Sequence, residues 1–194
     1  MIAHCSGHES KLQASQFPSS SQDRRLKVDR PAPPSECMAA LEIENVQDYP
    51  RPPSLERVQQ RLRVVLAGKT IVDSRRGLRV LETHHAPTYY IPMDDVRAHL
   101  IPSPGTSFCE WKGRAVYFDV KAGEAIASRA AWSYPEPTPG FVDLANHVAF
   151  YASAMDACYV GEERVIPQPG DFYGRWVTTN LKGRIKGGAG TEFW

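Results

Sequence analysis

The stretch RAVYFDVKAGEAIASRAAWSY, residues 114–134, contains two runs of strand-forming residues joined by Ala122-Gly123-Glu124. Valine, tyrosine, phenylalanine, isoleucine and tryptophan favour pleated strands, and glycine favours the turn between them. The stretch therefore predicts a β-hairpin. A single hairpin is not stable alone, so further strands must accompany it.

Other strands are expected on both sides of this hairpin. The segment RLRVVLAGKTIVDS (61–74) predicts two short strands around Gly68-Lys69. The segments GLRVLET (77–83) and TYYIP (88–92) predict a third and a fourth strand. The segment FYGRWVTTN (172–180) predicts another strand near the end of the chain.

One segment fits two structures. HVAFYASAMDACYVGEERVIP (147–167) can form a helix over residues 142–158 or strands around Gly161. We favour a short helical start near 140–146, a strand at 147–151, and a hairpin that turns at the glycine.

Short strands with turn signals roughly every 8–12 residues are typical of all-β folds. We expect a mainly β fold, a single compact domain of short antiparallel strands arranged as a rolled sheet, sandwich or tent, with one or two short helices. Residues 1–53 hold nearly half of the 16 prolines, and we expect a disordered, proline-rich tail and linker there, with disorder over 1–37. Residues 54–180 are expected to form the β domain, and residues 181–194 a basic, glycine-rich C-terminal tail.

The composition excludes several classes of partner. Hydrophobic residues make up 42% and charged residues 23%, and the formal net charge is +1, so no field favours nucleic acid. No apolar run reaches the ~20 residues of a membrane span. The start lacks the apolar stretch of a secretory signal, which predicts a cytoplasmic protein, or a plastid protein if residues 1–37 act as a transit peptide. The four cysteines form no CxxC and are expected to be free thiols.

The segment TSFCEWKG (106–113) brings a thiol, an indole and an amine together. Cys109 is a candidate nucleophile or redox centre, because a cation such as Lys112 lowers the pKa of a nearby thiol. Alternate side chains of an extended chain share a face, so Cys109 would face away from Lys112 unless Gly113 marks a bulge or turn. In the alternative, Cys109 packs in the core, since free cysteine is among the most buried residue types.

The segment LETHHAP (81–87) offers acid–base chemistry. On a strand, Glu82 and His84 would lie on one face, and Glu82 would orient His84 as a general base. We therefore take Glu82 and His84 as candidate catalytic residues and expect no role for His85. In the alternative, Glu82 pairs with an arginine such as Arg79 or Arg114, and the histidines are solvated loop residues.

Aromatic residues concentrate in the same stretches. Rings with polar tips often line ligand pockets, although they also build the core of small β domains. We expect a small-molecule pocket near residues 82–84, 109–112 and 132–134, with an anionic group held by a lysine. The expected substrate-binding residues are Lys112, Trp111, Tyr117, Trp132 and Tyr134.

No metal and no cofactor are expected. Cys109, Cys158, His84 and His147 lack the close spacing of a zinc site. The basic tail around Lys182 lacks the interleaved aromatic residues that single-strand nucleic-acid binders use. A small molecule is therefore the expected partner.

Four stretches resemble the family called domain of unknown function 427: RVLETHHAPTYYIPMDDV (79–96), TSFCEWKGRAVYFDV (106–120), AAWSYPEP (130–137) and HVAFYASAMDA (147–157). The resemblance runs from about Arg61 to Val165 and implies a compact, mostly β domain of unknown biochemical role. The family is sometimes labelled nucleotidyltransferase-like. That chemistry usually shows a spaced pair of metal-binding aspartates, whereas Asp94 and Asp95 are adjacent, so we do not expect it here.

Three functions stay open at this point. The domain is an enzyme that uses Cys109, a non-catalytic binding module for a small anionic or nucleotide-like ligand, or a structural or partner-binding domain whose motif only builds the core.

Overall fold

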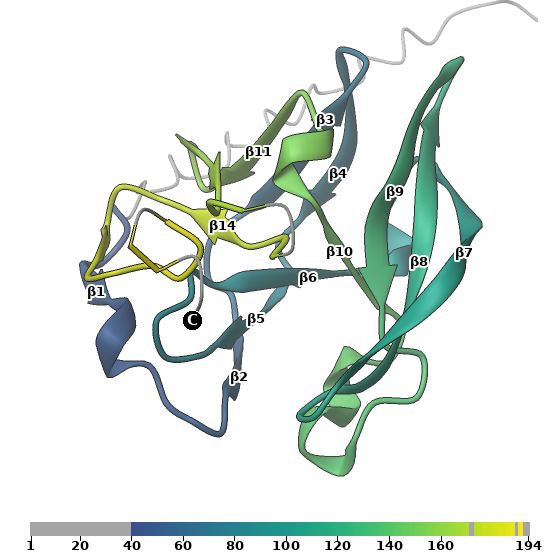
Figure 1. The fold of residues 1–194 in the computed structure, drawn as a ribbon. Helices are drawn as coiled ribbons and strands as arrows, with labels where there is room; N and C mark the ends of the chain where they lie inside the picture. Colours follow the sequence, from purple (N-terminus) through teal and green to yellow (C-terminus); the bar gives the residue numbers. More distant parts are fainter. Residues whose placement is uncertain (1–39, 171–172, 189, 192–194) are drawn as a thin grey trace, which may run out of the picture. The chain divides into compact units, whose positions relative to one another are not determined.

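A computed structural model describes residues 40–170, 173–188 and 190–191, all within the unit that runs from Cys37 to Trp194. The expected disorder over residues 1–37 lies outside the described residues. The described part is mainly β, as predicted, and contains one large open sheet and several smaller ones (Figure 1).

The large sheet has seven strands, and all its neighbouring strands are antiparallel. In spatial order the strands are β2 (Ser54–Arg57), β5 (Leu78–Leu81), β6 (Thr88–Pro92), β10 (His147–Phe150), β9 (Ala125–Ser133), β8 (Gly113–Ala122) and β7 (His99–Cys109). Strands β8 and β9 are the predicted hairpin, joined at Gly123, whose φ is 65°. That prediction is confirmed.

A second antiparallel sheet packs against one face of the first. Its order is β12 (Glu163–Arg164), β11 (Ala157–Val160), β3 (Leu62–Leu66) and β4 (Lys69–Ser74). The predicted hairpins at Gly68-Lys69 and Gly161 are both present. The largest hydrophobic cluster joins Leu62 and Val64 of this sheet to Ile91, Val148 and Phe150 of the seven-stranded sheet.

The flanks of the chain close against each other in a short parallel pair. β1 (Glu44–Asn45) pairs with β15 (Leu181–Lys182), and a further pair joins β13 (Ile166–Pro167) to β14 (Trp176–Val177). Val46 and Tyr49, which follow β1, are buried. Parts of the expected linker and of the expected C-terminal tail therefore pack onto the β domain.

The helices are short 3-10 segments: η1 (Val46–Asp48), η2 (Met93–Asp95), η3 (Pro139–Leu144) and η4 (Ala152–Ala154). Segment η3 and strand β10 agree with the structure that we favoured for residues 140–151. None of the helices in the described part is long and apolar enough to cross a membrane.

Strand β7 was not predicted, because Pro102 and Pro104 interrupt its sequence. Proline lacks the N–H that a central strand needs, but an edge strand tolerates it. β7 lies at the edge of the seven-stranded sheet, and its pairing with β8 shifts register between Ser103 and Thr106. The position of the strand in the sheet therefore explains its unusual composition.

The two faces of the large sheet have different neighbours. In β6, Tyr89 and Ile91 point into the core between the sheets, whereas Tyr90 belongs to a second cluster on the other face. In β10, Phe150 joins the first cluster and Ala149 joins the second. The second face is therefore available to form a site.

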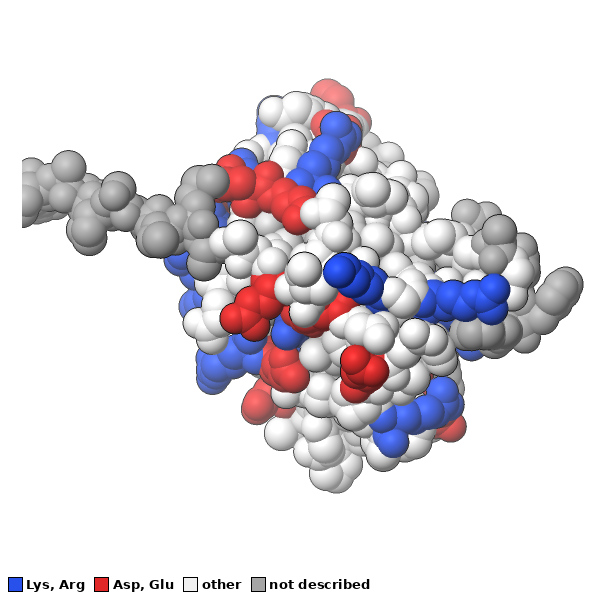
Figure 2. All heavy atoms as spheres, turned by 90° about the vertical axis from the view of Figure 1, so that its left-hand side faces the viewer, with Lys and Arg blue, Asp and Glu red and all other residues white. Residues whose placement is uncertain are grey.

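Charged side chains of both signs are interspersed on the surface. Figure 2 shows acidic and basic groups next to one another on one face of the molecule. Several are paired, such as Arg61 with Asp73 and Arg63 with Glu162.

The core between the sheets predicts a large difference between two phenylalanines. Phe150 is 0% exposed, and Phe108 is 77% exposed. Phe150→Ala should lower the free energy of unfolding by about 3–5 kcal/mol, because it leaves a cavity in packed surroundings. Phe108→Ala, the matched control, should change it by less than about 1 kcal/mol. Chemical denaturation measures both, and equal losses would contradict the packing of the two sheets.

Candidate functional site

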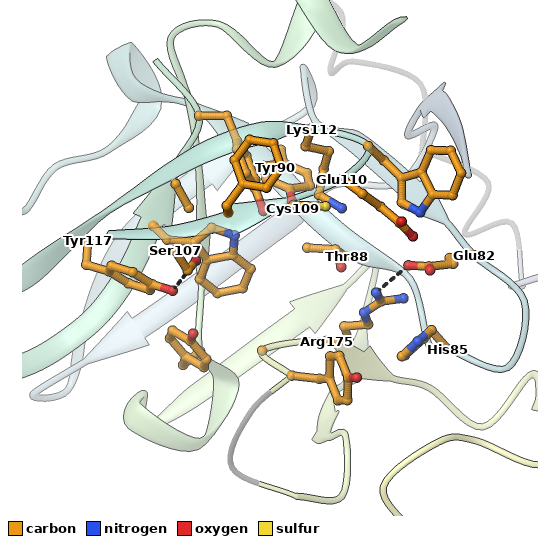
Figure 3. Close-up of a pocket in the computed structure, with 18 of the residues that line it drawn as sticks. Glu82, His85, Thr88, Tyr90, Ser107, Cys109, Glu110, Lys112, Tyr117 and Arg175 are labelled. Carbon is orange, nitrogen blue, oxygen red and sulfur yellow. Dashed lines mark hydrogen bonds and ion pairs between the residues drawn. The ribbon is translucent and has the colours of Figure 1, made fainter. Parts of the chain in front are cut away.

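A cavity of about 500 Å³ lies on the second face of the seven-stranded sheet (Figure 3). Strands β6, β8 and β9 line it with Thr88, Tyr90, Tyr117 and Trp132, and Tyr134 follows the end of β9. Residues two apart in a strand share a face, which explains why Trp132 and Tyr134 both reach the cavity.

The turn between β7 and β8 supplies a thiol and an amine. Cys109 at the end of β7 pairs with Gly113 at the start of β8, so residues 110–112 form the turn. Gly113 has a φ of 95°, which glycine adopts without strain. The reversal of the chain places Lys112 Nζ beside Cys109 Sγ at the cavity (Figure 3). The turn that we required for a contact between these two groups is therefore present.

The segment after β9 holds this turn in place. Thr138 N donates to Lys112 O (3.3 Å), and Thr138 Oγ1 donates to Trp111 O. A Cβ at Gly113 would lie 3.2 Å from Glu136 O, so glycine also allows the two segments to approach closely.

Lys112 is a buried amine. The residue is 6% exposed, and Nζ lies 5.7 Å from the ring centroid of Tyr134 and 5.9 Å from that of Phe141. Burial lowers the pKa of Lys112, and the charge of Arg175 lowers it further, while Cys109 opposes the shift. At neutral pH a larger fraction of this amine is uncharged than of an exposed lysine.

Residues 82–85 form a turn and not the expected strand. β5 ends before them, and His85 N donates to Glu82 O (3.0 Å). Glu82 and His85 line the cavity, whereas His84, with a φ of 64°, places Nδ1 3.3 Å from Arg184 O and does not line it. The expectation that Glu82 and His84 share a strand face is therefore wrong, and His85, for which we expected no role, lies at the cavity instead of His84. A turn does not follow the two-residue alternation of a strand.

Both carboxylates of the cavity are held by arginines. Arg175 Nη2 lies 2.7 Å from Glu82 Oε2 (Figure 3). The more exposed Arg51 lies 3.7 Å from the other oxygen of Glu82. Arg51 also lies 3.2 Å from Glu110. Glu82 thus pairs with arginines, but with these two and not with Arg79.

Gln168 determines which nitrogen of His85 carries the proton. Gln168 Oε1 accepts a hydrogen bond from Ala86 N (3.1 Å), and Nε2 donates to Lys186 O (2.9 Å), which orients the amide. Nε2 also lies 3.3 Å from His85 Nδ1, so Nδ1 is the acceptor and the neutral ring carries its proton on Nε2. Burial, with the nearby charge of Arg175, lowers the pKa of His85 to about 2.

The opposite end of the cavity is rich in hydroxyl groups. Ser107 Oγ and Tyr117 OH are 2.8 Å apart (Figure 3), and the guanidinium of Arg129 lies 3.7 Å from the centroid of the Tyr117 ring. Burial, with the electrostatic effect of the nearby Tyr117, raises the pKa of Tyr151 to about 12. The cavity therefore has a hydroxyl end, at Ser107 and Tyr117, and a basic end, at Arg51, Arg175 and Lys186. Aromatic rings lie between the two ends.

Among the described residues that line the cavity, basic groups outnumber acidic ones. The five basic side chains are Arg51, Lys112, Arg129, Arg175 and Lys186, and the two carboxylates are Glu82 and Glu110. Two N–H donors of the lining, Arg175 Nη1 and Trp111 Nε1, are buried without a hydrogen-bond partner among the described residues. An unsatisfied buried donor costs about 1–3 kcal/mol, so an acceptor bound here would recover that energy.

Seven of the eight residues expected in the site line the cavity together: Glu82, Cys109, Trp111, Lys112, Tyr117, Trp132 and Tyr134. His84 does not. The lining residues that the sequence did not indicate include Arg51, His85, Tyr90, Arg129, Tyr173, Arg175 and Lys186. Single arginines and tyrosines in short segments carry no signal of their own. Among the described residues, no three His, Cys, Asp or Glu side chains form a group that could hold a metal ion.

Residues 54–161 match the family described as a domain of unknown function (DUF427). The match covers more than half of the 194 residues, from β2 to β11, and includes the turn at residues 110–112. Arg51, Arg175 and Lys186 lie outside it. No curated protein matches the chain.

The environment of His85 predicts a dependence of stability on pH. The pKa of the His85 imidazole is about 2 in the folded state, whereas in the unfolded state it has its ordinary value of 6.5. Below pH 6.5 the unfolded state therefore binds a proton that the folded state does not. Stability should therefore fall as the pH drops below 6.5, by up to about 1.4 kcal/mol per pH unit from this group.

His85→Asn should remove that contribution, because asparagine still offers Gln168 an acceptor but does not titrate. Denaturation of both proteins between pH 7 and pH 5 measures the difference in slope. His147→Asn, at the start of β10 and outside the cavity lining, is the control. Equal slopes for His85→Asn and the unaltered protein would contradict a buried neutral imidazole.

Proposed function

We propose that this chain, which belongs to the family of the domain of unknown function DUF427, binds a small organic anion with a flat body. The observation that carries the proposal is the pair of buried, unpartnered N–H donors, Arg175 Nη1 and Trp111 Nε1. Both belong to residues that line a cavity with more basic than acidic groups. A carboxylate or phosphate supplies the acceptors that these donors lack, at a point where positive charge is in excess.

The fixed arrangement of the arginines supports an anion at this end. The ion pair with Glu82 uses Arg175 Nη2 and leaves Nη1 for a ligand. The neutral His85, with its proton on Nε2, is a further donor beside the cavity. Because Glu82 neutralises only part of the surrounding charge, an anion adds to a site that is still electropositive.

The middle of the cavity suits a flat ligand body. Tyr90, Trp132 and Tyr134 lie close together, with ring centroids 6.3–6.4 Å apart for the pairs that include Tyr90. Tyr151 lies 4.5 Å from Trp132 by ring centroids. Such rings offer apolar area with a few polar tips, which is typical of small-molecule sites. The hydroxyls of Ser107 and Tyr117 are placed to contact a polar group at the other end of the ligand.

A ligand screen with matched charge tests the proposal. The compounds 4-hydroxybenzoate and phenyl phosphate should raise the melting temperature of the full chain, and the neutral methyl ester of 4-hydroxybenzoate should not, because only the anions satisfy the buried donors. Thermal shift and calorimetric titration provide the measurement. The proposal fails if neither anion binds, or if the neutral ester binds as tightly as the acid.

Charge-removing variants locate the anion. Arg51→Met and Lys186→Met should each weaken binding of 4-hydroxybenzoate by about tenfold or more, as expected for a lost charge-assisted contact. Arg57→Met removes the same charge from an exposed position of β2 that does not line the cavity, and should leave binding unchanged. Equal effects of all three variants would indicate a general effect of charge rather than a site.

A second candidate is an enzyme that uses the Cys109 thiol as a nucleophile. The observation that favours it is the contact between Cys109 and Lys112 on the wall of the same cavity. A neighbouring amine can accept the proton of the thiol or stabilise the thiolate that attacks. Glu82 is a less suitable acid or base, because two arginines hold its carboxylate.

Alkylation tests the thiol and the charge of the cavity at once. Iodoacetate should label Cys109 faster than neutral iodoacetamide, although simple thiols prefer the amide, because the basic lining concentrates an anion. Peptide mapping follows the labelled residue. Cys158 is 1% exposed, burial raises its pKa, and it should stay unlabelled in the folded protein. A Cys109 that reacts only on unfolding would exclude the nucleophile.

A further inference from the structure

We infer that Lys112 forms an imine with a carbonyl group of the ligand, so that the ligand of this cavity is an anionic aldehyde or 2-oxo acid. The inference rests on the proposed binding of a small organic anion and names its reactive group. It is carried by the position of a buried amine on the wall of a cavity whose arginines already hold its carboxylates.

Among the described residues, no carboxylate forms an ion pair with Lys112. Arg175 and Arg51 hold Glu82, and Arg51 also holds Glu110. The near neighbours of Nζ are instead the rings of Tyr134 and Phe141 and the thiol of Cys109. A buried lysine without an ion pair is usually costly, because its ammonium loses hydration. It is the form of lysine that forms Schiff bases, since burial favours the nucleophilic neutral amine.

The surrounding groups would hold a carbonyl compound in a suitable orientation. Arg175 Nη1 and Trp111 Nε1, which are buried without a hydrogen-bond partner among the described residues, would bind the anionic group of the ligand. Arg175 and Lys112 face the same cavity, and Trp111 precedes Lys112 in the turn (Figure 3). A ligand whose anionic group and carbonyl group are linked by a short, flat body can therefore reach the donors and the amine together.

The reaction is balanced without any further reagent. The nitrogen lone pair of Lys112 attacks the carbonyl carbon, and the carbonyl oxygen takes up a proton to form a carbinolamine. The nitrogen loses one proton, the hydroxyl is protonated and leaves as water, and the iminium that results loses the remaining N–H proton. The sum is R₂C=O + H₂N–Lys112 → R₂C=N–Lys112 + H₂O. Cys109 Sγ, beside the amine, can relay the protons and is regenerated.

Reductive trapping of the full chain tests the inference. The protein is incubated at pH 7 with 4-carboxybenzaldehyde and cyanoborohydride, and the labelled lysines are identified by peptide mapping over time. Lys112 should be labelled at least tenfold faster than the exposed Lys69, because the anion holds the aldehyde in the cavity and a larger fraction of the buried amine is neutral. Mapping of the unaltered protein does not depend on whether a variant folds.

Three controls separate a site from general lysine reactivity. With the neutral methyl 4-formylbenzoate, most of the rate difference between the labelling of Lys112 and that of Lys69 should disappear. An excess of 4-hydroxybenzoate should protect Lys112 but not Lys69. Lys112→Arg cannot form an imine, so the fast, protectable label should disappear from the protein.

The outcomes distinguish this inference from the proposed function. Selective, protectable labelling of Lys112 supports both. Binding of 4-hydroxybenzoate without selective labelling of Lys112 overturns the imine and leaves the anion site in place. If neither anion nor anionic aldehyde binds, both proposals fail.

Discussion

The buried ion pair between Glu82 and Arg175 is the interaction on which the site depends. It joins a turn after β5 to the start of β14, 93 residues later in the chain. Trp176, next to Arg175, anchors that strand, because its Nε1 donates to Phe150 O (3.0 Å) and its backbone N to Pro87 O (3.1 Å). The guanidinium is thus positioned by the core. Separation of Glu82 from Arg175 would leave two unpaired buried charges, at a high cost in free energy. The pair therefore also holds the C-terminal segment against the sheet.

The sequence predicts those parts of the fold that depend on neighbouring residues. The hairpins around Gly68, Gly123 and Gly161 are local, so strand-forming runs and turn glycines identify them. β7 is missed because its prolines are tolerated only at a sheet edge, and the order of strands is not a local property. The turn at 82–85 illustrates the same limit, since a shift from strand to turn exchanges His84 for His85 in the cavity.

The residues of the candidate site also fall into those that local sequence predicts and those that depend on contacts between distant segments. Cys109, Lys112, Trp132 and their neighbours come from two adjoining hairpin segments, where spacing alone indicates a shared face. The basic end could not be predicted in this way, because Arg51, Arg175 and Lys186 reach the cavity through contacts between distant segments. One such contact is the hydrogen bond from Lys186 N to His84 O (2.8 Å). No periodicity in the sequence records a contact of this kind.

The pairing of β1 with β15 joins two segments that lie outside the family match. The parallel pair closes the two flanks over one side of the domain, and a Cβ at Gly183 would lie 2.3 Å from Asn45 Oδ1, so the closure is tight. The residues that match the family supply most of the aromatic rings of the cavity and the turn that contains Cys109, Trp111 and Lys112. The flanks supply three of the five basic groups described in the cavity: Arg51, Arg175 and Lys186. Under the proposed function, two short flanks can alter the choice of ligand while the sheet stays the same, so family members should be grouped by their flanks before an activity is transferred between them.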